Sequence, residues 1–247
     1  MVALARRKCW VNNGKEVSET LIDGPSSNII ELRDGIVVVS LAVTRSAQTL
    51  LYAFDADDRL VVQKGDKLDD LMFMPPGGKT NSVKLVSSDD RCLLWNKYSE
   101  TAHELVFKNV KADPDFKTIW DNKEDSVKNI VGGTDGRFVI ATAKTAYMLK
   151  GDKLDEIVIP GERTGGGSCL WALGDGWEIF FGEEKIWGRG KNLSNVLQND
   201  AKELKDWTEI KLGKDASGER GPFEAVNIVN VWSAPKAWAF QVWDDQV

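Results

Sequence analysis

Short runs of apolar and β-branched residues recur along the whole chain, and clusters of Gly, Asp, Asn, Ser and Pro separate them. This alternation is typical of β-strands joined by tight turns. No stretch keeps the 3.6-residue period of a long amphipathic helix. The pattern therefore predicts an all-β chain.

The predicted strands fall into sets of four. Successive sets begin roughly 45 residues apart, which is the period of a propeller blade. Four sets are complete and a fifth is incomplete, in the ranges 36–75, 82–120, 126–160, 168–213 and 225–247. We therefore predict a β-propeller with five four-stranded blades.

The fifth set contains only two predicted strands, at 225–232 and 237–243. Two N-terminal segments, 7–14 and 28–32, have the pattern of the missing third and fourth strands. We expect residues 7–32 to complete this blade, because a blade shared by both ends of the chain closes the ring and leaves no exposed edge. The whole range 1–247 would then form a single domain.

The hexapeptide KGDKLD occurs twice, at 64–69 and at 150–155, about two blade lengths apart. Both copies fall between the third and fourth predicted strands of their sets. We interpret them as equivalent turns, in which Gly allows the turn and Asp and Lys keep it solvated. Calcium binding by their carboxylates is the alternative, although neither copy has the ligand spacing of an EF-hand loop.

Three segments carry a resemblance to a known family. Val127–Gly133 has the spacing Val-x-x-Ile-x-x-Gly, Phe138–Ala141 follows it as an apolar strand, and Ile186–Gly190 reads Ile-Trp-Gly-Arg-Gly. They resemble the repeats of the regulator of chromosome condensation family, in which Ile186–Gly190 would correspond to a strand that carries a Trp-Gly pair. Two further segments, Leu94–Asn96 and Cys9–Asn12, resemble this Trp-bearing strand in shorter form. The resemblance implies a propeller that serves as a protein-binding platform. The chain departs from the family in lacking its Gly-x-x-His steps and in being too short for its usual number of blades.

The charge balance argues against one class of partner. Lys and Arg number 32 and Asp and Glu number 38, a net charge of −6. This sign does not suit a protein that binds nucleic acid by neutralising phosphates. No signal peptide or apolar membrane span is predicted, so we expect no membrane partner and a location in the cytoplasm or nucleus.

Signals for catalysis are sparse. His103 is the one histidine, and neither a Ser nucleophile motif nor a Cys-x-x-Cys pair occurs. The run Gly165–Gly167 lacks the Lys-Ser/Thr of a phosphate-binding loop. A glycosidase would need paired carboxylates, for which the acidic turns 55–58 and 89–90 are candidates. We predict that the protein is not an enzyme and that it uses no cofactor or metal.

We therefore expect a protein-binding adaptor or a subunit of a protein complex. Loops on a rigid scaffold generally carry function, and exposed Trp and Arg are favoured at interface hot spots. The residues that we expect to contact a partner are Arg163, Arg220, Phe223, Trp232 and Trp238. A carbohydrate-binding lectin is the alternative, although the loops between sets share no repeated aromatic pattern.

Overall fold

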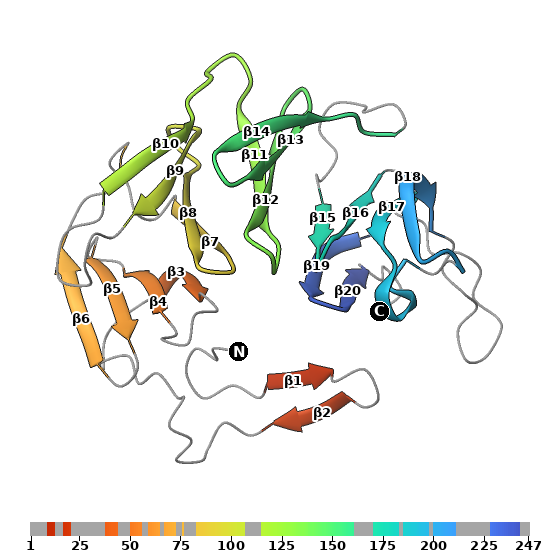
Figure 1. The fold of residues 1–247 in the computed structure, drawn as a ribbon. Helices are drawn as coiled ribbons and strands as arrows, with labels where there is room; N and C mark the ends of the chain where they lie inside the picture. Colours follow the sequence, from red (N-terminus) through yellow and green to blue (C-terminus); the bar gives the residue numbers. More distant parts are fainter. Residues whose placement is uncertain are drawn as a thin grey trace.

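The computed structural model is built from antiparallel strands (Figure 1). It describes residues 83–106, 115–160, 170–182, 185–197, 200–210 and 228–242, and before residue 83 it describes Pro76 and six strands. Those six strands are β1 (Cys9–Asn12), β2 (Val17–Thr20), β3 (Val38–Val43), β4 (Leu50–Asp55), β5 (Arg59–Lys64) and β6 (Lys67–Met72).

The later strands follow in the same manner. They are β7 (Val83–Ser88), β8 (Arg91–Asn96), β9 (Thr101–Val106), β10 (Asp115–Trp120), β11 (Val127–Gly132), β12 (Arg137–Thr142), β13 (Ala146–Lys150), β14 (Lys153–Ile157), β15 (Leu170–Leu173), β16 (Trp177–Phe181), β17 (Ile186–Lys191), β18 (Glu203–Glu209), β19 (Ile228–Ala234) and β20 (Ala237–Val242). Between β17 and β18 the structure also describes a short 3₁₀ helix, η2 (Leu193–Asn195). Within the described ranges, no helix is long and apolar enough to cross a membrane.

Four sheets of four strands make up most of the fold. The first sheet is β3–β6, the second β7–β10, the third β11–β14 and the fourth β15–β18. In each sheet every strand pairs antiparallel with the next strand along the chain. The predictions of an all-β chain and of four-stranded sets are confirmed for these four sheets.

The sheets stand side by side in an arc, with their first strands innermost (Figure 1). β3 contacts β7, β7 contacts β11, β11 contacts β15, and β15 contacts β19. This is a propeller-like arrangement, in which each sheet occupies the place of a blade.

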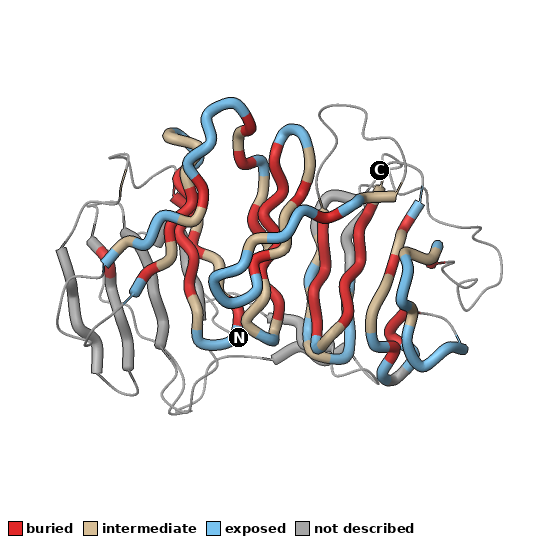
Figure 2. The backbone as a smooth tube through the Cα atoms, turned by 45° about the horizontal axis from the view of Figure 1, so that its top comes forward, coloured by how far each residue is buried: buried red, intermediate tan, exposed pale blue. Residues whose placement is uncertain are grey.

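Burial falls from the second strand of each sheet to the fourth (Figure 2). In β8 and β12 every residue after the first is buried, and β16 is buried throughout. The fourth strands β10, β14 and β18 are mostly exposed or half-buried. The second strands therefore read as continuous apolar runs, because a neighbouring sheet covers each of their faces.

Hydrophobic side chains fill the spaces between neighbouring sheets. Phe138 and Ile140 of the third sheet pack with Leu93 of the second. Val139 of the third sheet packs with Trp171 and Phe180 of the fourth. The fourth sheet in turn packs against the β19–β20 hairpin. The third and fourth sheets thus each bury one face against the sheet before and the other against the sheet or hairpin after.

The two KGDKLD segments form hairpins of identical register. Lys64 pairs with Lys67 across the β5–β6 turn, and Lys150 pairs with Lys153 across the β13–β14 turn. Gly151 has a φ of +57° at the first central position of its turn, where a type II′ hairpin needs a positive φ. The prediction of equivalent turns is confirmed.

The predicted shared blade is not confirmed. β1 pairs with β2 and β19 pairs with β20, and among the described strands no ladder joins the two hairpins. Figure 1 shows the β1–β2 hairpin at the open side of the arc. The partner of β1 lies at 17–20, and the predicted strand 28–32 lies outside the described residues. The nearer partner follows from the short separation, because Asn12 pairs with Val17 and strands so close in sequence commonly form an antiparallel hairpin.

Candidate protein-contact surface

Much of the polar chemistry between the sheets is structural. Arg91, the first residue of β8, donates from Nη1 to the carbonyl of Gly136 in the next sheet, at 3.2 Å. Arg137 occupies the same place in β12 and donates to the carbonyls of Gly174 and Trp177, at 3.1 and 3.2 Å. In the fourth sheet Trp177 takes this place, and its indole N–H donates to the carbonyl of Pro235 at 2.9 Å. We call these three contacts the sheet latches.

The latches have a sequence signature that the sequence analysis missed. Each donor follows a short acidic turn and begins an apolar strand: Asp89-Asp90-Arg91, Asp135-Gly136-Arg137 and Asp175-Gly176-Trp177. Asp135 also holds its own arginine, because its Oδ2 accepts from Arg137 Nε at 2.7 Å. The acidic turn at 89–90, a candidate for glycoside chemistry, is therefore part of a structural repeat.

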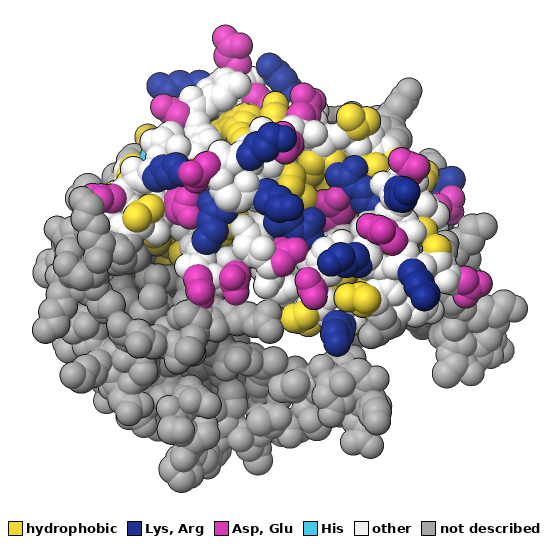
Figure 3. Space-filling model, viewed as in Figure 1, with side chains coloured by type: hydrophobic (Ala, Val, Ile, Leu, Met, Phe, Trp, Pro, Cys, Tyr) yellow, Lys and Arg dark blue, Asp and Glu magenta, His cyan; other side chains and the backbone are white. Residues whose placement is uncertain are grey.

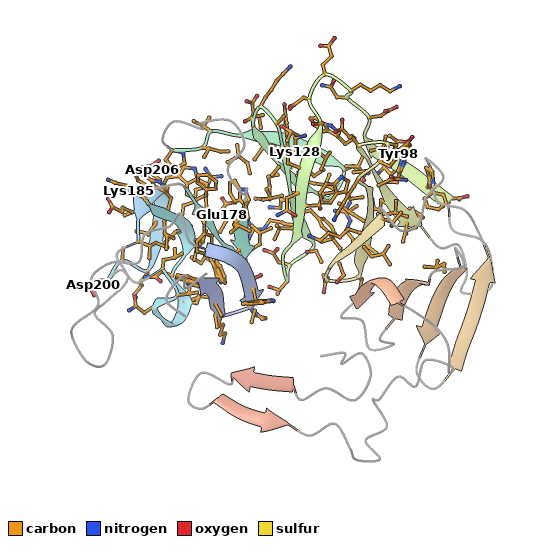
Figure 4. All side chains as sticks on the ribbon, turned by 180° about the vertical axis from the view of Figure 1, so that it is seen from behind. Tyr98, Lys128, Glu178, Lys185, Asp200 and Asp206 are labelled. Carbon is orange, nitrogen blue, oxygen red and sulfur yellow. The ribbon has the colours of Figure 1, made fainter. Side chains whose placement is uncertain are left out.

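A different polar group reaches the surface on the fourth sheet. The guanidinium of Arg189 on β17 lies over the ring of Trp207 on β18, with its Cζ 4.4 Å from the ring centroid. Its Nε forms an ion pair with Oε1 of Glu178 on β16, and the side chain of Glu178 is only 8% exposed. Figure 4 shows the fourth sheet from behind, with Glu178 labelled. Glu178 thus fixes the guanidinium from beneath, and the ring of Trp207 fixes its plane.

Aromatic and aliphatic neighbours surround this pair. The ring of Trp207 meets that of Trp171 edge-on, with centroids 5.8 Å apart, and Trp171 packs on Phe180 at 4.9 Å. The indole N–H of Trp207 donates to the carbonyl of Val158 at 2.9 Å. The side chain of Val158 is itself 83% exposed. We define the aromatic–arginine surface as Val158, Trp187, Arg189 and Trp207.

Two buried polar atoms lie beneath this surface. Oε2 of Glu178 and Nε1 of Trp171 have no hydrogen-bond partner among the described residues. Burying an unpaired polar atom costs about 1–3 kcal/mol. The cluster therefore holds more polar groups than its own contacts satisfy.

Three of the predicted contact residues lie outside the described residues: Arg163, Arg220 and Phe223. The segments that contain them follow Pro160 and Ile210. Pro160 is two residues from Val158, and Ile210 is three residues from Trp207. Both segments thus leave the described structure next to the aromatic–arginine surface.

The other two predicted contact residues lie on opposite faces of the β19–β20 hairpin. Trp232 is 56% exposed. Trp238 is half-buried, its indole N–H donates to the carbonyl of Val196 at 2.8 Å, and its ring meets Phe181 edge-on at 5.6 Å. We therefore assign Trp238 a role in holding the hairpin against the fourth sheet, while Trp232 stands free.

The carboxylates of the second KGDKLD turn are engaged by lysines. Asp152 forms an ion pair with Lys117 of the second sheet, and Lys153 pairs with Asp155 at 2.7 Å. The hydrogen bond and charge of Lys117 hold the pKa of Asp152 below its usual value. No group of three potential metal ligands occurs among the described residues.

Comparison with known proteins gives a likeness in solved structures only. A scan against models of protein families finds no match, and a search of curated proteins finds none either. Among solved structures, the chain is similar to a catalytically inactive variant of virginiamycin B lyase from Staphylococcus aureus, determined with quinupristin. Sequence identity is 14% and the TM-score is 0.43, over 76% of this chain and 60% of the lyase chain. This chain spans less than two thirds of the lyase's length, and we transfer no activity from it.

Proposed function

We propose that this protein is a non-enzymatic, protein-binding adaptor that contacts its partner through the aromatic–arginine surface. The observation that carries the proposal is the stacking of Arg189 on Trp207 beside the exposed side chain of Val158. Trp and Arg are the residues most enriched at interface hot spots. The surface combines both with an aliphatic side chain at the rim.

Rigidity supports this proposal. An arginine that must be ordered on binding loses side-chain entropy, at a cost of about 0.5–1.5 kcal/mol. Arg189 is already held by Glu178 and by the face of Trp207. A partner that met this surface would not incur that cost. We further propose that Arg163, Arg220 and Phe223, which lie outside the described residues, contribute to the contact.

The electrostatic character of the surface supports a protein partner rather than nucleic acid. Figure 3 shows Lys and Arg side chains intermixed with Asp and Glu over the described face, with apolar atoms exposed between them. Lys185 beside the surface is paired with Glu209 at 3.1 Å. A mixed surface of this kind suits the polar rim of a protein interface.

The exposed side chain of Val158 allows a direct test. We expect Val158→Asp to leave folding unchanged, because substitutions at exposed positions usually change stability by less than about 0.5 kcal/mol. It should weaken partner capture from native extract about tenfold or more, because it replaces an apolar contact of the interface with a charge. Quantitative affinity purification of both forms measures this.

Leu193→Asp is the matched control, since Leu193 is an exposed aliphatic residue in η2 of the same sheet. It should retain the partner. Loss of the same proteins with both variants, or with neither, would count against the aromatic–arginine surface as the contact site.

We also propose that the scaffold beneath this surface is a closed ring of five blades. The pattern of exposure along β19 and β20 supports closure. Val231 and Trp238 pack against the fourth sheet, whereas the alternate residues Trp232, Ala234 and Ala239 are exposed. An apolar sheet face normally packs against another element. The first sheet would cover this face, and β1–β2 would extend the fifth blade beyond β20.

The resemblance to the regulator of chromosome condensation family remains part of the proposal. In its favour, Ile186–Gly190 belongs to β17, a third strand, as in the family's Trp-bearing element. Leu94–Asn96 belongs to β8, a second strand, and so does not occupy the equivalent place. The adaptor function therefore rests on the surface and not on the repeat pattern.

A further inference from the structure

A second group of side chains, away from the aromatic–arginine surface, brings two positively charged lysines to one tryptophan. Lys84 on β7 and Lys97 in the turn after β8 both lie over the ring of Trp95, with their Nζ atoms 6.0 and 5.5 Å from the ring centroid. Lys84 stands opposite Trp95 in the β7–β8 ladder. The two ammonium groups are thus brought to one end of the second sheet.

Among the residues that the structure describes, neither ammonium group has an acidic partner. The lysines around them show the usual alternative, since Lys128 reaches Glu100 at 3.9 Å. Among the described residues, no carboxylate lies within ion-pair distance of Lys84 or Lys97. Lys84 instead donates to the amide oxygen of Asn129 on the third sheet, at 3.2 Å. Two uncompensated cations stand together on a chain whose net charge is −6.

The burial of Lys84 makes this arrangement costly. Its pKa is lowered because burial disfavours the charged form and because Lys97 repels it. A buried or half-buried charge normally has a counter-charge. Both effects would be relieved by an anion placed between the two lysines.

The ring over which both lysines lie carries a third donor. Trp95 is 6% exposed, and its indole N–H has no acceptor among the described residues. Lysine ammonium groups and an indole N–H can only donate hydrogen bonds. The two ammonium groups and the indole N–H are therefore all donors, and a bound acceptor would satisfy them.

We propose that Lys84 and Lys97 form a binding site for an oxyanion, namely a carboxylate or phosphate group. The ammonium groups supply charge-assisted hydrogen bonds, which are the strong ones. Asn129 orients Lys84 from the third sheet, so the site lies where the second and third sheets meet. Figure 4 labels Tyr98 and Lys128 at this end of the two sheets. The site does not depend on the aromatic–arginine surface.

The reactivity of the Lys84 amine tests the proposal. The full-length protein is treated with acetic anhydride at increasing concentrations of one of two probe anions, inorganic phosphate or acetate. Mass spectrometry follows the acetylation of each lysine. Bound anion should slow acetylation of Lys84 by about tenfold at saturation, the size of one charge-assisted contact. Protection by phosphate alone identifies a phosphorylated ligand, and protection by both ions identifies a carboxylate-bearing ligand.

Lys97→Gln and Lys128→Gln form the matched pair of variants. Lys97 is exposed in a turn, so its replacement should not impair folding, and thermal melting of both variants checks this. We expect Lys97→Gln to raise the phosphate concentration needed for half-protection about tenfold and Lys128→Gln to leave it unchanged. Absence of protection with both ions would overturn the proposal, and so would an equal effect of the two variants, which would indicate general surface charge.

Discussion

His103 is held between two threonine hydroxyls. Its Nε2 lies 3.1 Å from Oγ1 of Thr101, and its Nδ1 lies 3.4 Å from Oγ1 of Thr118 on the neighbouring strand β10. Phe116 meets the ring edge-on at 6.3 Å. The residue is 7% exposed, and burial lowers the pKa of its imidazole although the charge of Asp121 opposes the shift. These contacts give His103 a packing role in the second sheet.

This lowered pKa makes stability depend on pH in a defined direction. The unfolded chain binds a proton at His103 near pH 6.5, whereas the folded chain binds it only at lower pH. The contribution of neutral His103 is therefore fully present above about pH 6.5 and decreases as pH falls below that value. Urea midpoints between pH 7.5 and 5 should fall more steeply for the native chain than for His103→Gln. Parallel curves would contradict this assignment.

Residue roles were predictable where they depended on strand pattern alone. Trp95 and Trp187 lie in predicted apolar strands, and Trp95 is buried while Trp187 packs half-buried between the third and fourth sheets. The stacking of Arg189 on Trp207 was not predictable. The β17–β18 ladder shifts register between Gly188 and Gly190, and this irregularity determines which residue of β18 stands beside Arg189. Sequence pattern does not reveal such a shift.

Close packing of strands from different sheets depends on a single glycine. A Cβ placed on Gly132 of β11 would lie 2.0 Å from the carbonyl oxygen of Ser87 on β7. Because the obstacle is backbone, no side-chain rotation relieves the contact. Gly132 thus sets how near the second and third sheets can stand.

We expect Gly132→Ala to separate β7 from β11 and to destabilise the fold by about 1–3 kcal/mol, the usual cost of overpacking. Gly151→Ala is the comparison, since nothing lies within 4 Å of its added Cβ and only its positive φ opposes the change. That variant should lose about 1–2 kcal/mol through backbone strain without altering contacts between sheets. Hydrogen exchange of the β7 and β11 amides distinguishes the two. Equal protection of those amides in both variants would contradict the role of Gly132.

At the scale of elements, the KGDKLD repeat predicted strand pairing more accurately than the pattern of apolar residues did. The paired KGDKLD segments correctly placed two equivalent hairpins, because register in a two-residue hairpin is fixed by its turn. The N-terminal strands were harder. β1 pairs with β2 (Val17–Thr20), whereas the sequence pattern indicated 28–32 as the neighbouring strand. Four residues of VSET carry little apolar signal.

At the scale of the whole molecule, the exposed face of β19–β20 is the feature that ring closure would change. Trp232, Ala234 and Ala239 share this face. In an open arc they remain in water, and in a closed ring the first sheet covers them. The Trp232 side chain therefore stabilises the fold only in the closed ring, where it is buried, and contributes little in the open arc.

Trp232→Asp distinguishes these arrangements. If the ring closes, the variant should lose about 3 kcal/mol or more of stability, because it removes a packed aromatic residue and buries a charge. Deleting residues 1–14 should also destabilise the ring by several kcal/mol through lost burial and unpaired backbone groups. Thermal or urea denaturation measures both. A change in Trp232→Asp of less than about 0.5 kcal/mol would show that its face is open in solution.

The sheet latches also impose an order on synthesis. In each latch the donor comes earlier in the chain than its acceptor: Arg91 precedes Gly136 by 45 residues, and Trp177 precedes Pro235 by 58. A ribosome adds roughly 5–20 residues per second. Each newly made sheet must therefore wait several seconds, its donor still in water, until the turn of the following sheet emerges. The second, third and fourth sheets are therefore incomplete when first translated, and the part of the chain made after each of them supplies its missing hydrogen-bond acceptors.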